Sequence, residues 1–433
     1  MPRARLLDEA WLHLHQPAAG QPGLVSRGDC EVEFNRTYEA LMAAWLEQHQ
    51  ACLHLIADAG DDPGDAESYY QESLVEWSDS LAALPPSLIT LLAVHPPFGL
   101  RTAVSALTAL TRLELAYTDT ATDEEIGTLD LSIAAHHLRP LMRFRQLSMA
   151  AVDMSGNADE LLSVPALAGL QALELRNCGL QASPPSLFSL THLTALSLSE
   201  NLLWTHTSAL ASLAALQQLQ SLDLSGCGLG AVPQQLFFTE LPAQLSALTA
   251  LTCLDLSSNS FLCLGWQHLV ALPQLQDLSL SSLELTAVPG QLSALTALTR
   301  LKLHGNKLVV GWQHLQPLTQ LQDLSLAECG LTTVPQQVTA LTALTRLDLS
   351  SSYELHGGWQ HLLPLAKLQD LNLSWCNLTA LPGQLSVLMA LDRLDLSGSY
   401  CQQPASLEDS SSPAGEAQAG FSQLPLLSAC CRE

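Results

Sequence analysis

The stretch Leu298-Thr-Arg-Leu301-Lys-Leu303-His-Gly-Asn306-Lys-Leu308 decides the fold of most of this chain. Leucines occupy its first, fourth, sixth and eleventh positions, and an asparagine occupies the ninth. The same arrangement, with substitutions, recurs about twelve times between Leu110 and Leu396. Recurrence at a nearly fixed period predicts a solenoid built from stacked repeats.

Each repeat is located by the leucine equivalent to Leu301, which we call the middle leucine. From Leu254 to Leu394 the middle leucines are 23 or 24 residues apart, so these repeats should superpose. The interval before Leu254 is longer, and we expect its segment Phe237–Pro242 to be a loop insertion. The middle leucines are Leu113, Leu147, Leu173, Leu196, Leu222, Leu254, Leu278, Leu301, Leu324, Leu347, Leu371 and Leu394.

The leucine spacing predicts one strand in each repeat. Leu301 and Leu303 alternate with polar residues, as a strand with one buried face requires. A single repeat cannot bury these leucines, so neighbouring repeats must stack to form a continuous core. The sequence therefore predicts an α/β solenoid whose parallel strands form the concave face.

The pattern L-x-x-L-x-L-x-x-N/C-x-L resembles the leucine-rich repeat over about residues 105–400. The segment Leu331–Leu347 is similar to the short intracellular repeats of Ras-group scaffold proteins and of green-algal proteins. This resemblance implies a horseshoe that binds protein on its concave face, in signalling assemblies or in ciliary axonemes. Repeats that contain Gly-Trp-Gln-His depart from that subclass.

The resemblance also implies that the residue five positions after each middle leucine points inward and bonds neighbouring backbone groups. Four of the eleven cysteines lie in this inner column, and the chain has no C-x-x-C pair, so we expect free thiols and a reducing compartment. Leu283, Ser352 and Ser399 depart from the pattern. The matching residues are Cys178, Asn201, Cys227, Asn259, Asn306, Cys329 and Cys376.

Composition narrows the classes of partner. A net charge of −25 disfavours nucleic acid and anionic membranes, which attract basic surfaces. No apolar run approaches the eighteen or so residues of a membrane span, and the amino terminus carries acids where a signal peptide is apolar. We therefore expect a cytoplasmic protein, with the cytoskeleton or cilium axoneme as the alternative location.

Residues 1–86 differ from the repeats, with fifteen acidic residues against four arginines. Their apolar periodicity predicts two amphipathic helices, near Arg36–Ala57 and Ser68–Leu84. We interpret this region as a helical cap over the open end of the leucine core; the alternative is an acidic hairpin that binds an effector.

The remaining chain divides into a solenoid at residues 87–400 and a tail at residues 401–433. The tail is rich in Ser, Pro, Ala and Gly, which predicts disorder. Cys430 and Cys431 near its end leave lipidation as a minor alternative to a protein without membrane contact.

Gly-Trp-Gln-His occurs in alternate repeats from Gly265 onward. Alignment places Gly311 and Trp312 where other repeats have valine and proline, which predicts an indole folded into the space that glycine leaves. The alternative is an exposed stripe of Trp266, Trp312 and Trp359.

The histidines of the Gly-Trp-Gln-His segments do not predict a metal site. They are two repeats apart, which corresponds to a separation of roughly 10 Å, whereas the ligands of one metal ion lie about 2 Å from it.

Exposed strand positions form columns along the predicted concave face. The column before the middle leucines alternates in charge from Asp277 to Arg393, which predicts ion pairs between adjacent strands; a charged recognition strip is the alternative. Trp375, flanked by Asp348, Asn372 and Glu328, is the most favoured anchor for a partner. The candidate protein-binding residues are Arg300, Lys302, His304, Asp323, Glu328, Arg346, Asp348, Asn372, Trp375 and Arg393.

No catalytic motif or cofactor-binding loop is recognisable in the sequence. The sequence therefore favours a non-catalytic scaffold or adaptor that binds protein partners, in intracellular signalling. A structural component of a cytoskeletal or axonemal complex is the alternative. A ubiquitin-ligase substrate receptor is less favoured, because no F-box pattern is present. An enzyme whose active site lies in residues 1–86 is the third class of function that we consider.

Overall fold

The computed structural model describes residues 13–15, 52–58, 89–95, 102–116, 127–128, 131–203, 210–228, 240–260, 262 and 264–399. The chain divides into two compact units, Met1–Leu219 and Gln220–Glu433. The predicted helix Ser68–Leu84 and the tail at residues 401–433 lie outside the described residues, as does the first half, 237–239, of the predicted insertion.

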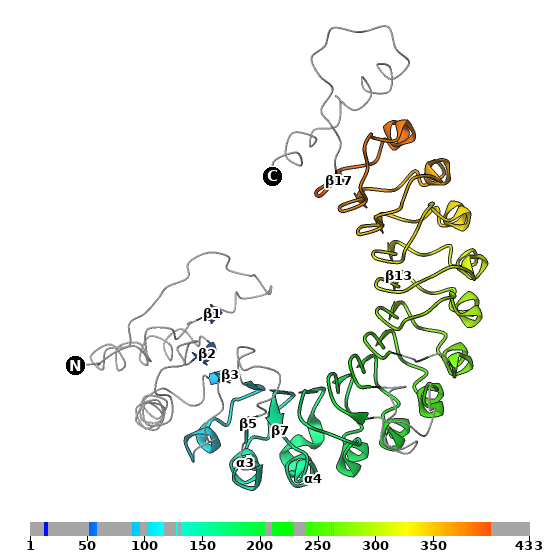
Figure 1. Ribbon diagram of the computed structural model, residues 1–433. Coiled ribbons are helices and arrows are strands. Elements are labelled where there is room, and N and C mark those ends of the chain that lie inside the picture. The colour runs from blue at the N-terminus through cyan, green and yellow to red at the C-terminus, as the bar shows by residue number, and fades with distance from the viewer. Residues whose placement is uncertain are drawn as a thin grey trace, which may run out of the picture. The chain divides into compact units, whose positions relative to one another are not determined.

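The strands of the first unit pair in chain order (Figure 1). β1 is antiparallel to β2, and every later strand in this sheet is parallel to the one before it. Two short strands, β5 (Gly127–Thr128) and β7 (Val152–Asp153), form a separate pair. The strands of the larger sheet are β1 (His13–His15), β2 (Cys52–Asp58), β3 (Ile89–His95), β4 (Arg112–Ala116), β6 (Gln146–Ala150), β8 (Ala172–Arg176) and β9 (Ala195–Ser197).

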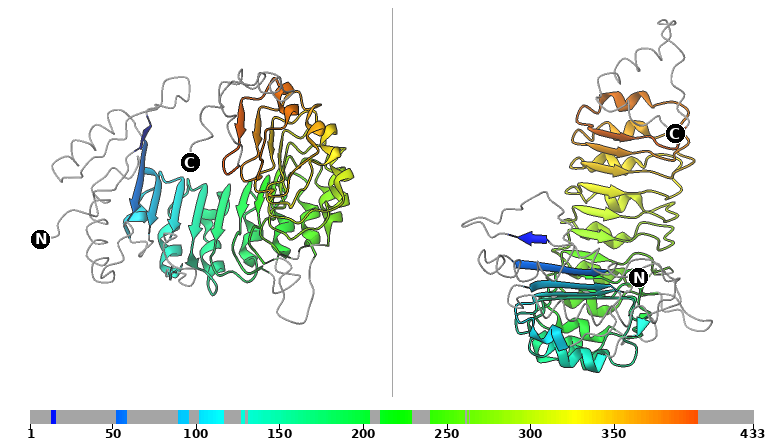
Figure 2. Two further views of the ribbon diagram at one scale, coloured as in Figure 1. Left: turned by 45° about the horizontal axis from the view of Figure 1, so that its top comes forward. Right: turned by 90° about the vertical axis from the view of Figure 1, so that its left-hand side faces the viewer.

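The second unit is a parallel sheet with one short strand in each repeat (Figure 2). Neighbouring strands align middle leucine to middle leucine, as Leu278, Leu301 and Leu324 do across three successive strands. The strands are β10 (Ser221–Asp223), β11 (Cys253–Asp255), β12 (Asp277–Ser279), β13 (Arg300–Lys302), β14 (Asp323–Ser325), β15 (Arg346–Asp348), β16 (Asp370–Asn372) and β17 (Arg393–Asp395).

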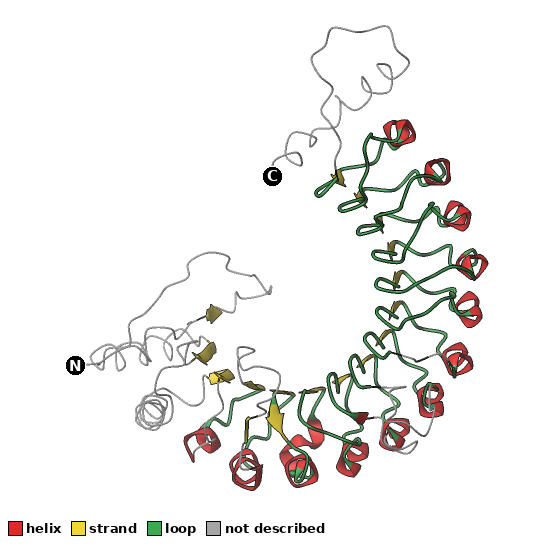
Figure 3. Cartoon of the chain, viewed as in Figure 1, coloured by secondary structure: helices red, strands yellow, loops and turns green. Residues whose placement is uncertain are grey.

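Short helices return the chain from one strand to the next. In the second unit they lie along the side opposite the strands (Figure 3). Most are 3₁₀ helices, and several begin after a proline, whose fixed φ suits a first turn. The helices are η1 (Thr102–Ala106), α3 (Leu131–Leu138), α4 (Ala158–Leu162), η2 (Pro165–Gly169), η3 (Pro185–Ser189), η5 (Ala211–Ala215), η6 (Ala243–Ala247), η7 (Trp266–Ala271), η8 (Gly290–Ala294), η9 (Trp312–Leu315), η10 (Gln336–Ala340), η11 (Trp359–Leu362) and η12 (Gly383–Val387).

The repeats and their core confirm the prediction from leucine spacing. Each of the twelve middle leucines lies on a strand, and eleven of them are buried. Leu394, on the last described strand, is half-buried because no described strand follows to cover it. The leucine-rich repeat solenoid with a parallel sheet is therefore the observed fold.

The helix predicted at Arg36–Ala57 is wrong over Cys52–Ala57. These residues belong to strand β2, which pairs with β3 in parallel through Leu55 and Leu92. The sheet thus extends three strands, β1 to β3, further toward the amino terminus than the repeat pattern indicated. The rest of that predicted helix lies outside the described residues, so the helical cap stays a prediction there.

Asparagines of the inner column link their repeats to the repeat before. Asn306 Nδ2 donates to the carbonyl oxygens of Leu280 and Leu303, both at 2.8 Å, and its Oδ1 accepts from the N–H groups of Leu283 at 3.2 Å and Leu285 at 2.9 Å. Leu280, Leu283 and Leu285 belong to the preceding repeat. One buried amide therefore satisfies backbone groups that the turn would otherwise leave unpaired.

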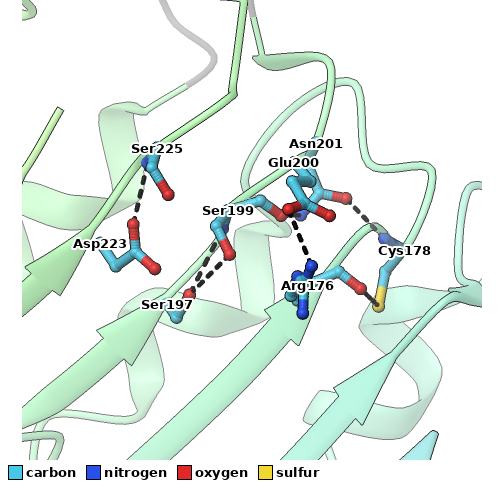
Figure 4. Close-up of polar contacts among 8 residues, drawn as sticks. All are labelled: Arg176, Cys178, Ser197, Ser199, Glu200, Asn201, Asp223 and Ser225. Atoms are coloured by element: carbon cyan, nitrogen blue, oxygen red, sulfur yellow. Dashed lines mark hydrogen bonds and ion pairs between the residues drawn. The ribbon is translucent and has the colours of Figure 1, made fainter. Parts of the chain in front are cut away.

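Asn201 forms the same set of contacts in the first unit, and Figure 4 shows the one with Cys178. Its Oδ1 accepts from the N–H of Cys178 at 2.9 Å. All seven residues predicted to point inward in this column are buried, which confirms their orientation. Leu283 and Ser352 are buried there as well, and the Ser352 hydroxyl has no described hydrogen-bond partner.

Cysteine fills the same place with a weaker donor. The Cys329 thiol donates to the Leu303 carbonyl at 3.1 Å, and the Cys376 thiol donates to that of Leu349 at 3.2 Å. Burial raises the pKa of Cys178 to about 12 and that of Cys329 to about 11, so both thiols keep the proton that they donate. Cys178, Cys227, Cys253, Cys329 and Cys376 are free thiols.

Strand β6 and each of the strands β8 to β17 are followed by a left-handed turn residue, four positions after the middle leucine. Its φ is 55° at Ala151, 53° at Glu328 and 56° at Trp375, and glycines take the same conformation at Gly305 and Gly398. Side chains are strained in this region, so the stack imposes the turn on residues that do not prefer it. We call these positions the turn column.

The glycine of each Gly-Trp-Gln-His segment has a different role from the predicted one. Gly265, Gly311 and Gly358 have φ of 80°, 89° and 81°. A Cβ on Gly311 would lie 2.6 Å from the carbonyl oxygen and 2.8 Å from the nitrogen of Val288 in the preceding repeat. The space beside this glycine is thus filled by a neighbouring backbone rather than by the indole.

The indoles themselves are largely covered. Trp266 and Trp359 are buried, and Trp312 is half-buried. The predicted burial is confirmed for two of the three tryptophans, and an exposed stripe of indoles is not what forms.

Replacing Asn306 tests the inner column. Asn306→Ala should lower the free energy of unfolding by at least about 2 kcal/mol, because each buried group left unpaired costs about 1–3 kcal/mol. Asn306→Cys should cost less, since Cys329 fills the equivalent position one repeat further on. Urea denaturation of the three proteins measures both losses. Equal losses would show that the hydrogen bonds are not what the column contributes.

Gly311 and Gly330 form a matched pair for the close backbone approach. Both have a positive φ, but a Cβ on Gly330 would meet no atom within 4 Å. Gly330→Ala should therefore cost only the strain of the left-handed conformation, about 1–2 kcal/mol. Gly311→Ala should lower the melting temperature by clearly more, because its Cβ would overlap the Val288 backbone. Similar shifts for both variants would contradict the close approach.

Candidate functional site

The outward side chains of β11 to β17 form the candidate site, which we call the strand face. Two columns define it, and strand pairing sets residues of one column side by side. The first column precedes the middle leucines and contains Cys253, Asp277, Arg300, Asp323, Arg346, Asp370 and Arg393. The second column follows the middle leucines and contains Asp255, Ser279, Lys302, Ser325, Asp348, Asn372 and Asp395.

Charges of the first column pair with each other, as predicted. Each arginine contacts the aspartate of the preceding strand. The nitrogen–oxygen distances are 2.8 Å for Arg300–Asp277, 2.8 Å for Arg346–Asp323 and 3.6 Å for Arg393–Asp370. The arginine side chains are more than half exposed, so each pair contributes about 0–1 kcal/mol to stability. The first column is therefore close to neutral over these six strands.

Acidic and amide side chains of the second column are held by their own strands. Asp348 Oδ1 accepts from the N–H of Ser350 at 3.0 Å, and Asn372 Oδ1 accepts from that of Ser374 at 3.0 Å. Asp395 accepts from both the N–H and the hydroxyl of Ser397, at 2.9 Å and 2.7 Å. These contacts fix each side chain through Oδ1, which leaves Oδ2 of the aspartates for other partners.

The part of the face around β13 contains Lys302 and His304. His304 Nδ1 lies 2.8 Å from the Ser281 hydroxyl, which continues through Ser279 at 3.3 Å to Ser257 at 2.6 Å. This chain of hydroxyl groups holds the imidazole in place. Lys302 is exposed, and no ion pair involves it within the described part of the chain.

A shallow depression of about 390 Å³ lies over β13 to β17. It contains seven of the ten residues that the sequence nominated. Asp370 and Asp395 also line it, although the sequence did not nominate them. Both lie in the exposed columns, on the last two described strands, β16 and β17. The lining consists of Lys302, His304, Asp323, Ser325, Arg346, Leu347, Asp348, Asp370, Asn372, Arg393 and Asp395.

Arg300, Glu328 and Trp375 lie outside the depression. Arg300 is paired with Asp277, and Glu328 is exposed in the turn column. Trp375 is also in the turn column and is 57% exposed. Its indole lies against Gly398, where a Cβ would come within 2.5 Å of the ring. The predicted patch is thus divided: Asp348 and Asn372 line the depression, and Trp375 stands beyond the end of its strand.

The histidines of the Gly-Trp-Gln-His segments make separate local contacts. His361 Nδ1 lies 2.8 Å from the carbonyl oxygen of Val334, and His314 Nε2 lies 3.2 Å from Nε2 of Gln313. Among the described residues, no group of three or more His, Cys, Asp or Glu side chains is placed to hold a metal ion. In the same part of the chain, none of the helices has the length and apolar character of a membrane span.

Comparison with known proteins supports the repeat assignment. The family described as leucine rich repeat matches residues 168–229 and 246–308. No curated protein sequence matches the chain significantly.

Several solved structures share the fold. A leucine-rich repeat protein of Leptospira interrogans is 24% identical with a TM-score of 0.53, over 75% of this chain and 74% of that one. An internalin of Listeria monocytogenes is 17% identical with a TM-score of 0.50, over 83% and 95%. TLR13, solved as a complex with ssRNA13, is 23% identical with a TM-score of 0.51, over 74% of this chain and 49% of that one. At these identities the likeness concerns the fold alone.

The repeated leucine pattern, the aligned strands and the inner column of Asn and Cys agree with these matches. The chain contains leucine-rich repeats and has the solenoid fold that they form.

Proposed function

We propose that this chain is a non-catalytic scaffold that binds a protein partner on the strand face of its second unit. The observation that carries the proposal is a fixed surface with charges left for a partner. Lys302, Asp348 and Asp395 project from strands of the parallel sheet, and their neighbours in the first column are already paired. A preorganised surface of this kind loses little conformational freedom on binding.

The shape of the site favours a macromolecular partner over a small molecule. Sites for small molecules are concave and mostly apolar, and they bury most of the ligand. The depression over β13 to β17 is shallow, and Leu347 is the single apolar residue in its lining. A nucleic acid partner is disfavoured because four aspartates line the same depression and the chain carries a net charge of −25.

The proposal places the scaffold in the cytoplasm, as an adaptor in signalling. The inner-column cysteines support a reducing compartment, because they donate to the neighbouring carbonyl groups as reduced thiols. Fractionation of cells that express the chain tests the location. Recovery in the soluble cytoplasmic fraction is the expected result; recovery in a detergent-resistant pellet would favour a cytoskeletal or axonemal role instead.

Charge reversal at Lys302 is the main test of the strand face. Lys302→Glu should reduce capture of the partner from native cell extract at least about tenfold, or about 1.4 kcal/mol, because repulsion replaces attraction. Lys367→Glu is the matched control: it makes the same change at an exposed residue between η11 and β16, off the strand face. Equal capture by both variants would contradict the proposal.

Trp375→Ala tests whether the turn column contributes to the same interface. A partner that covers this indole should bind about thirtyfold more weakly, since aromatic anchors contribute 2 kcal/mol or more. The melting temperature should change little, because the side chain is more than half exposed. Met389→Ala is the control, since Met389 is 85% exposed and follows η12. Unchanged capture by Trp375→Ala would restrict the interface to the depression.

A further inference from the structure

The second column alternates between charged and neutral residues. Charged side chains occur on β11, β13, β15 and β17, as Asp255, Lys302, Asp348 and Asp395. The intervening strands β12, β14 and β16 carry Ser279, Ser325 and Asn372. This alternation follows the two kinds of repeat, because the Gly-Trp-Gln-His segments also belong to alternate repeats.

Lys302 is the exception in this series. Three of the four equivalent positions are aspartate, and the fourth is lysine. Duplication of a two-repeat block accounts for the aspartates but not for the change of sign. The depression therefore has a cationic end at Lys302 and anionic positions at Asp348 and Asp395.

The spacing of these charges selects the conformation of a bound segment. Adjacent strands are about 4.8 Å apart, so Lys302, Asp348 and Asp395 lie about 10 Å from one to the next. A polyproline II helix has three residues per turn and a rise of about 3.1 Å, so it presents a side chain on one face every 9 Å or so. A β-strand presents one about every 6.6 Å, which does not match.

The neutral strands fit the backbone of such a segment. A polyproline II helix has no internal hydrogen bonds, so its carbonyl and N–H groups need outside partners. Asn372 uses Oδ1 to accept from Ser374, which leaves its Nδ2 as a donor on the face between Asp348 and Asp395. Ser325 supplies a hydroxyl group between Lys302 and Asp348.

We infer that the strand face binds an extended protein segment in the polyproline II conformation, with an acidic residue at Lys302 and basic residues three and six positions away at Asp348 and Asp395. This inference rests on the proposed function and names its partner. The segment can run in either chain direction, because the charges fix only their order across the strands. The paired arginines of the first column form the wall beside it.

The experiment is a selection from a random peptide library on the full chain, repeated with Lys302→Glu and with Lys367→Glu. The wild type and Lys367→Glu should both enrich peptides with one acidic residue and basic residues three and six positions from it. Lys302→Glu should enrich peptides with a basic residue in place of the acidic one.

One enriched peptide then serves as a fluorescent probe of affinity. It should bind the wild type at least about tenfold more tightly than it binds Lys302→Glu, and replacing its acidic residue by lysine should reverse that order. A probe of the same composition, with its charges two positions apart, should bind at least about tenfold more weakly to the wild type.

Three outcomes would overturn the inference. Enriched peptides that depend on Lys302 but show no three-residue spacing would refute the polyproline II geometry and leave the proposed function intact. Enriched peptides that bind Lys302→Glu as tightly as the wild type would place the partner elsewhere. If the wild type enriches no peptide, the inference of a peptide partner is refuted. The proposed scaffold function would still be supported if the wild type captures a folded protein and Lys302→Glu does not.

Discussion

The hydrogen bond that an inner-column Asn or Cys makes to the preceding repeat is the interaction on which the other features depend. Asn306 reaches the Leu280 carbonyl, and Cys329 reaches the Leu303 carbonyl at the equivalent place. The bond lets the chain leave the strand through a tight left-handed turn without burying unpaired backbone groups. It also links consecutive repeats at a fixed register, so leucines of one repeat cover those of the next. Without it, the turns that contain Asn or Cys would bury unsatisfied polar groups.

The same constraint makes the strand face a usable surface. Each turn fixes its strand from the carboxyl end, and the Asp or Asn of the second column fixes it again by accepting from an N–H two residues on, as Asp348 does from Ser350. Side chains of adjacent strands are therefore held at a regular interval, without flexible loops between them. A partner that matches this interval gains several contacts for one ordering cost, whereas any single contact on an exposed face is weak.

Leucine periodicity was sufficient to predict the repeats, their strands and the inner column, because these depend on contacts that recur at every repeat. It did not predict β2, since Cys52–Asp58 has the apolar spacing of an amphipathic helix as well as that of a strand. Nor did it explain Gly311, whose small size is required by the Val288 backbone of another repeat. The first-column ion pairs were predictable from charge alternation alone. The sequence could not show that seven of the ten nominated residues line one depression. Glu328 and Trp375 belong to the same repeats as some of these residues, but they lie in the turn column, outside the depression.

The charges on the strand face show how a repeated sequence acquires specificity. Duplication by itself produces a periodic surface, on which a partner could bind in several registers separated by two strands. The paired Asp and Arg residues of the first column have this periodicity, so they cannot fix a register. Lys302 breaks the periodicity at one place: a segment that pairs an acidic residue with it meets repulsion from Asp255 or Asp348 if it shifts by two strands in either direction. A single change of sign is therefore enough to define one binding register on an otherwise repeating face.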